Sequence, residues 1–169
     1  MLKILVSACL LGNKVRYNGS DVPCESDLLS KWQAEGRLVP FCPEIAAGFG
    51  VPRAPAEIAG GDGDAVLDGS AQVFDSRGRN VSNQYVYGAA QALILARTHG
   101  VSLAILKDGS PSCGSTYTYD GTFSGVRRSG HGVTPALLGR SGIRVFDETE
   151  IEVVANYIAA LEISKPQEP

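Results

Sequence analysis

Short apolar runs alternate with helical patterns along this chain, and this alternation restricts the fold more than any other feature of the sequence. Continuous apolar runs predict four buried strands, at 2–6, 38–41, 101–106 and 143–146. Capping residues and helical spacing predict helices at 26–36, 81–98, from Thr134-Pro135 onward, and 148–161. Strands that alternate with helices pair in parallel and are covered on both faces. The sequence therefore predicts an α/β, Rossmann-like, three-layer fold with a mostly parallel sheet.

Two segments of the chain fall outside this alternation. Residues 48–64 are rich in Gly and Pro and predict an extended surface loop. Residues 65–74 alternate in polarity and predict a small hairpin insertion that turns at Asp68-Gly69. The 169 residues suit one ordinary domain. We expect a single α/β domain at 1–163 and a flexible tail at 164–169.

The N-terminus and the charge of the chain bear on its location and partners. The first apolar run is broken by small and polar residues from Ser7, so a buried strand explains it better than an export signal does. No run is long enough to cross a bilayer. We therefore expect a cytoplasmic protein with free thiols and no membrane partner. A net charge of -3 argues against a long nucleic acid as partner, but small nucleotides stay compatible.

Three of the four cysteines follow predicted strands. Cys9 comes shortly after the first strand, Cys42 directly after the second, and Cys113 in the loop after the third. The carboxyl ends of parallel strands meet at one crevice, so these thiols could lie together there. Any one of them alone could equally be a small buried hydrophobe. Each is flanked by turn-forming residues, however, which is unusual for core cysteines; Cys24 is assigned no role.

Three thiolates could hold several kinds of metal centre. Zinc usually takes a fourth Cys or His ligand, and among the histidines only His131 is suitably placed. A 4Fe–4S cluster can instead be held by three thiolates, which leaves one iron open to a small molecule. Thiol redox chemistry is a further alternative, although the closely spaced cysteine pair typical of oxidoreductases is missing.

Polar residues near these cysteines are candidates for catalysis or substrate binding. Glu44 could move a proton, or could simply cap a helix. Ser110 and Ser112 could polarise a substrate, or could stabilise a turn. Arg53 could meet a phosphate or a carbonyl, although a single arginine is more often a solvated surface residue. Asn18 could hydrogen-bond a base edge, although turn formation alone explains it.

Four blocks of sequence resemble the thiouracil desulfurase family, also called thiouridine desulfidases, which was long a domain of unknown function. The blocks are VSACLLGNKVRYNG (6–19), FCPEIAAGFGVPRAPAEI (41–58), LKDGSPSCG (106–114) and GVTPALL (132–138). The resemblance implies a Rossmann-like domain whose 4Fe–4S cluster sits on the cysteines that match Cys9, Cys42 and Cys113. It also implies that Glu44 and Ser110 assist the reaction. Some members carry an extra C-terminal domain, for which we expect no room here.

The chemistry that the resemblance implies is a desulfuration without redox change. The open iron of the cluster binds the sulfur of a thiolated pyrimidine, water attacks the ring carbon, and hydrosulfide leaves. The expected substrate is thiouracil or thiouridine, as base, nucleoside or monophosphate, with the sulfur at ring position 2 or 4. The alternatives are a non-catalytic metal- or cluster-binding sensor, a small-nucleotide-binding module, or a zinc protein that uses His131.

Overall fold

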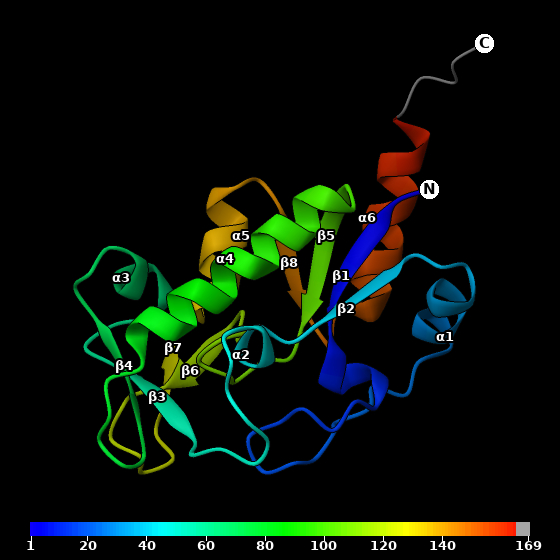
Figure 1. The fold of residues 1–169 in the computed structure, drawn as a ribbon. Coiled ribbons are helices and arrows are strands. Elements are labelled where there is room, and N and C mark those ends of the chain that lie inside the picture. The colour runs from blue at the N-terminus through cyan, green and yellow to red at the C-terminus, as the bar shows by residue number, and fades with distance from the viewer. Residues whose placement is uncertain (165–169) are drawn as a thin grey trace.

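A four-stranded parallel sheet forms the centre of the computed structural model, which describes residues 1–164 (Figure 1). The strand order is β2-β1-β5-β8. The strands are β1 (Lys3–Ser7), β2 (Leu38–Phe41), β5 (Val101–Leu106) and β8 (Arg144–Asp147). In register, Leu5 of β1 pairs with Val39 of β2 and with Ala104 of β5. These strands lie within one residue of the predicted ones.

Helices cover both faces of the sheet and complete three layers. On one face lie α1 (Asp27–Ala34) and α6 (Ile151–Ile163), and on the other α4 (Ser82–Thr98) and α5 (Val133–Arg140) (Figure 1). The helix α5 starts at Val133, so Pro135 is its third residue and not its first. The Rossmann-like α/β fold predicted from the sequence is confirmed.

Alternation along β1 shows how the sequence fills both layers. Ile4 and Val6 are fully buried against Leu29 and Trp32 of α1 and residues of α6, because successive side chains of a strand point to opposite faces. Leu5, between them, packs on the other face in the core that contains alanines of α4. Both faces of β1 are thus covered by apolar side chains, which explains why its sequence is a continuous apolar run.

The segment between β2 and α4 differs from the prediction. The expected loop contains a strand, β3 (Ala56–Ala59), and the expected hairpin begins with a short helix, α3 (Gly63–Leu67), before β4 (Gln72–Asp75). A hairpin is present, but β3 and β4 form it across α3. The proposed turn at Asp68-Gly69 is therefore wrong. The side chain of Asp62 caps α3 by accepting from the amide of Ala65 at 3.2 Å, which stabilises a helix where the Gly-rich sequence suggested a loop.

Several short elements were not predicted at all. They are η1 (Ala8–Leu11), α2 (Pro43–Ala46), β6 (Tyr117–Tyr119) and β7 (Arg127–Ser129). Of the expected tail at 164–169, residues 165–169 lie outside the described residues. Within residues 1–164, no helix has both the length and the apolar character that a membrane span requires.

Gly88 of α4 lets α2 approach, and this approach positions the residues that begin α2. A Cβ at Gly88 would lie 2.4 Å from the carbonyl oxygen of Pro43. We expect Gly88→Ala to lower the free energy of unfolding by about 1 to 3 kcal/mol, because a backbone atom must move to make room. Denaturant unfolding measures this. Gly139→Ala is the matched control, since a Cβ there meets nothing within 4 Å and alanine favours the helix. Equal stability of the two variants would contradict the packing argument.

Candidate functional site

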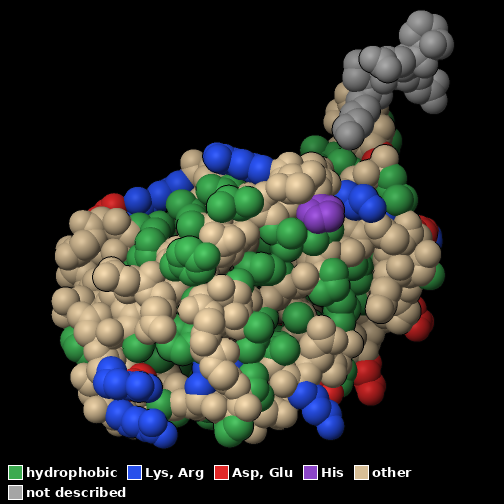
Figure 2. Space-filling view, in the orientation of Figure 1, with side chains coloured by type: hydrophobic (Ala, Val, Ile, Leu, Met, Phe, Trp, Pro, Cys, Tyr) green, Lys and Arg blue, Asp and Glu red, His purple; other side chains and the backbone are tan. Residues whose placement is uncertain are grey.

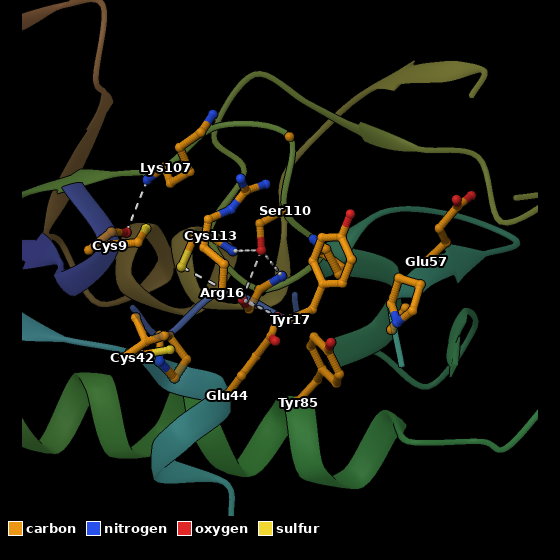
Figure 3. A pocket seen from close by; sticks show the side chains of 18 of the residues that line it. Cys9, Arg16, Tyr17, Cys42, Glu44, Glu57, Tyr85, Lys107, Ser110 and Cys113 are labelled. Atoms are coloured by element: carbon orange, nitrogen blue, oxygen red, sulfur yellow. Dashed lines mark hydrogen bonds between the residues drawn. The ribbon is translucent and has the colours of Figure 1, made fainter. Parts of the chain in front are cut away.

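The three strand-end cysteines line one cavity of about 490 Å³ at the carboxyl edge of the sheet. Cys9 lies in η1 directly after β1, Cys42 is the N-cap of α2 directly after β2, and Cys113 lies in the loop after β5. Figure 3 shows the three side chains gathered at one end of the cavity. The parallel sheet therefore brings together cysteines that are widely separated in sequence.

Burial and mutual proximity determine the acidity of these thiols. Burial, followed by the charge of Cys42, raises the pKa of Cys9 to about 11, although Arg16 and Lys107 act in the opposite direction. Burial and then Cys42 also raise the pKa of Cys113, and burial raises that of Cys42. Three thiols this close and this buried do not readily ionise together without a nearby positive charge. A metal centre supplies such a charge, and thiolates are the form in which cysteine binds metals.

The loop that carries Cys113 is organised by Asp108. One carboxylate oxygen, Oδ1, accepts from the amides of Gly109, Ser115 and Thr116 at 2.9, 3.0 and 3.1 Å. The other accepts from the hydroxyl of Thr116. Burial alone would raise the pKa of Asp108, but these hydrogen bonds outweigh it and lower the pKa. The loop is thus closed on itself, and Cys113 is held toward the cavity.

Glu44 is the central carboxylate of the cavity and is held at both oxygens. It is 9% exposed and lies in the first turn of α2. Its Oε2 accepts from Nε of Arg53 at 2.5 Å, and its Oε1 accepts from the hydroxyl of Ser112 at 3.0 Å. Tyr85 of α4 lies beside it: burial, and then the charge of Glu44, raise the pKa of the Tyr85 hydroxyl well above its usual value. The carboxylate therefore has a fixed orientation inside the cavity.

Two serines connect Glu44 with the cysteine end of the cavity. The hydroxyl oxygens of Ser110 and Ser112 are 2.9 Å apart, and Ser112 Oγ is 3.6 Å from Sγ of Cys113. Ser110 Oγ also accepts from the amides of Ser112 and Cys113 at 3.1 and 3.3 Å. Because the Ser112 hydroxyl donates to Glu44, the Ser110 hydroxyl is left to donate to Ser112. The result is a chain of hydroxyl groups from Ser110 through Ser112 to Glu44.

Of the two candidate substrate-binding residues Arg53 and Asn18, only Arg53 lies at the cavity. Arg53 lines the cavity, and its guanidinium also donates to the carbonyls of Val15 and Gly50 at 2.8 and 3.2 Å, so it supports Glu44 and the adjoining loops. Asn18 does not line the cavity; its side chain accepts from the amide and hydroxyl of Ser20 at 3.1 and 2.6 Å, as a turn residue does.

Two residues considered for metal binding also lie elsewhere. His131 is exposed and faces Asp64 at 3.3 Å, and it does not line the cavity of the cysteines. It is therefore not placed as a fourth ligand for zinc. Cys24 is half-buried and lies 3.7 Å from the carbonyl oxygen of Glu148 through its Sγ, also outside this cavity.

The far end of the cavity is lined by aromatic side chains. Figure 3 shows Tyr17 and Tyr85 on the side away from the cysteines, with Glu57 beyond them. The hairpin of β6 and β7 adds Tyr117, Tyr119 and Phe123. Planar, apolar walls with a few fixed polar groups suit a small aromatic ring. The cavity thus has a thiol end, a central carboxylate and an aromatic end.

Sequence reasoning missed several residues of this site. Lys107 and Asp108 directly follow β5, and Ser7 is the last residue of β1, so they lie at strand ends, which is the same signal that identified the cysteines. Ser7 is buried and its hydroxyl accepts from the amide of Lys107 at 3.0 Å. Tyr85 gave no such signal, because it lies within a long helix and reads as one of its core residues.

An iron–sulfur cluster fits the residues at the thiol end. Among residues 1–164, no three His, Cys, Asp or Glu side chains lie close enough together to bind one metal ion. The three thiols instead face a shared space from three different segments of the chain. A 4Fe–4S cluster is wider than a single ion and is bound by thiolates. Cys9, Cys42 and Cys113 are the residues that would hold it.

Comparison with known proteins agrees with the motifs. The sequence model of the 2-thiouracil desulfurase family matches residues 4–150. The chain belongs to this family. The uncharacterized protein YbbK of Bacillus subtilis (strain 168) is 47% identical over 148 residues, which cover 88% of this chain and 97% of that relative. A solved structure of the 4Fe–4S-dependent thiouracil desulfidase TudS has a TM-score of 0.86 and 42% identity, and the match covers 95% of this chain and 99% of that chain. The family resemblance inferred from the sequence blocks is confirmed.

Proposed function

We propose that this chain is a 4Fe–4S-dependent enzyme that removes sulfur from thiolated pyrimidines, with Cys9, Cys42 and Cys113 holding the cluster. The observation that carries the proposal is the cavity itself, in which three strand-end thiols, a fixed carboxylate and aromatic walls are combined. Membership of the 2-thiouracil desulfurase family and the likeness to the desulfidase TudS support it. One desulfidase domain at 1–163, in the reducing cytoplasm, suits the four free cysteines.

The proposed reaction replaces the sulfur of a thiocarbonyl by oxygen from water. When bound, the cluster supplies an iron that no cysteine holds and that acts as a Lewis acid on the sulfur. Glu44 holds the attacking water and takes its proton. Ser112 and Arg53 keep the Glu44 carboxylate oriented, and Ser110 fixes Ser112. Sulfur leaves as hydrosulfide with no net transfer of electrons, so the reaction needs no reductase, flavin or nicotinamide.

The aromatic end of the cavity would hold the pyrimidine ring. Tyr17 and Tyr85 lie opposite the cysteines, so a ring placed between them would present its sulfur toward the thiol end (Figure 3). A cluster-binding sensor without turnover is less well supported, because the space beside the cysteines is large enough for a ring and contains a buried carboxylate. The same space argues for a small substrate.

The direct test is sulfide release from matched amounts of 2-thiouracil, 2-thiouridine, its monophosphate and thiolated tRNA. Protein purified without oxygen should turn over the small molecules and act much more weakly on tRNA. The net charge of -3 gives no general attraction for a polyanion, and in Figure 2 the Lys and Arg side chains lie scattered around the edge of the face shown. No sulfide from any substrate would refute the function, and a clear preference for tRNA would refute the size argument.

A further inference from the structure

The turn between β6 and β7 carries an aromatic side chain to the rim of the cavity. Phe123 lines the cavity and is 41% exposed. Its φ is +56°, in the left-handed region that an aromatic residue rarely adopts. Such a conformation persists only where the surrounding contacts hold it.

Glu57 of β3 supplies those contacts. Its Oε1 accepts from the amides of Gly121 and Phe123, both at 3.1 Å. Glu57 lies 66 residues before Phe123 in the chain, so these bonds join the turn to the other hairpin. In Figure 3, Glu57 lies at the end of the cavity away from the cysteines. The carboxylate thus fixes the backbone from which the Phe123 ring projects.

The turn also packs directly on the backbone of β3. Gly121 has a φ of +93°, and a Cβ there would lie 2.8 Å from the Cα of Ala59. Within the turn, Asp120 accepts from the amide and the hydroxyl of Thr122 at 3.0 and 2.6 Å. Hydrogen bonds and close packing therefore hold the turn, and with it Phe123, in a fixed position at the cavity rim.

We propose that Glu57, by holding Phe123 at the cavity rim, limits the substrate to a free base, a nucleoside or a mononucleotide and excludes an internal nucleotide of a polynucleotide. This inference rests on the proposed desulfuration. An internal nucleotide carries a chain on both sides of its ribose, and both chains must leave through the rim. An aromatic side chain on a fixed turn leaves no room for both chains to pass. Glu57 is a positioning residue and Phe123 a specificity residue.

Positive charge near the rim would favour a polynucleotide, so charge and the position of Phe123 predict opposite substrate preferences. Arg127 and Arg128 of β7 are exposed and would attract an anionic chain. Arg127 lies over the ring of Tyr117, with 4.2 Å from its guanidinium carbon to the ring centroid, and Arg128 is close enough to help lower the pKa of Asp120, after the hydrogen bonds from Thr122. If charge governed access, a polynucleotide would be favoured. If the fixed Phe123 side chain governs access, a polynucleotide is excluded.

The experiment compares variants on substrates of graded size. Phe123→Gly removes the ring and suits the positive φ, and Glu57→Ala removes the two hydrogen bonds to the turn. Val126→Ala is the matched control, because Val126 is 51% exposed near the same turn but does not line the cavity. Cluster-loaded proteins are assayed on 2-thiouracil, 2-thiouridine and a trinucleotide with a central 2-thiouridine. Hydrogen exchange of residues 120–126 is measured in parallel.

We expect the ratio of kcat/KM for the base to that for the trinucleotide to fall about 10-fold in Phe123→Gly and Glu57→Ala, and to stay unchanged in Val126→Ala. Exchange at 120–126 should accelerate in Glu57→Ala while the cluster absorption stays constant. An unchanged ratio, a wild-type preference for the trinucleotide, or unchanged exchange would overturn the inference. If the wild type releases no sulfide at all, the proposed function fails instead. The inference is then decided by the binding of uridine and unmodified trinucleotide, measured by calorimetry, where equal affinities for the two would overturn it.

Discussion

Replacing Cys9, Cys42 or Cys113 with alanine should remove most of the brown colour of protein purified without oxygen. The unchanged protein should contain about four irons and four sulfides per chain, as a 4Fe–4S cluster requires. Each of the three thiols lines the same cavity and approaches it from a different segment, and each is proposed to supply one ligand, so its loss should leave only two cysteines for the cluster. The measurements are the visible absorption spectrum and the iron and sulfide contents.

Cys24→Ala is the control for this prediction. Cys24 is also a free cysteine, but it lies outside the cavity, beside the carbonyl oxygen of Glu148. The Cys24 variant should keep its colour, its iron and its sulfide. A colourless, zinc-loaded wild type would show that the metal centre is misassigned. Equal loss of iron in the Cys24 variant would show that the three cysteines are not a distinct set.

Glu44→Gln should slow sulfide release by roughly 100-fold or more while the cluster spectrum stays intact, which is the usual effect of losing a general acid or base. Glutamine keeps the shape of the side chain but cannot take a proton from water. It also has one acceptor oxygen where Glu44 uses two, so Arg53 and Ser112 cannot both keep their present bonds. Single-turnover sulfide release, measured together with the spectrum, separates catalysis from cluster binding.

Two further measurements define what Glu44 does. Ser110→Ala should be milder, because all the hydrogen bonds that it removes are neutral and only the one to Ser112, worth about 1 kcal/mol, leads toward Glu44. The Arg53 side chain is 8% exposed and loses its counter-ion in the Glu44 variant, which lowers the stability of the protein. Denaturant unfolding of this variant checks that it still folds. Loss of the cluster in Glu44→Gln would make this residue structural or ligating. Near-normal turnover would assign the proton transfer to another group.

The thiol end of the site could be predicted because it depends on a general property of parallel sheets. Cys9, Cys42 and Cys113 each follow a strand, and parallel strands place their carboxyl ends at one edge. Those strands could be recognised in the sequence as continuous apolar runs, since buried parallel strands are apolar on both faces. The convergence of the three thiols therefore follows from local sequence and one topological rule.

The other end of the cavity could not be predicted in this way, because it depends on contacts between distant segments. Glu57 lies in what reads as a Gly- and Pro-rich loop, yet pairing with β4 makes it part of a strand, and its bonds to Gly121 and Phe123 join two separate hairpins. Local propensity carries no information about such pairings, since a short strand is stabilised mainly by its neighbours.

The roles of individual polar residues were likewise decided by tertiary structure. Asn18 and Arg53 both lie near turns and read alike as binding residues. Only the fold shows that Asn18 closes its own turn, whereas Arg53 crosses to the carboxylate of Glu44 at 2.5 Å. The sequence by itself determined the layered sheet and its three cysteines, because hydrophobic periodicity and the succession of strands and helices along the chain are local properties. The orientation of Glu44 and the aromatic walls were decided only by packing, because hydrogen bonds and close contacts between distant residues exist only once the chain has folded.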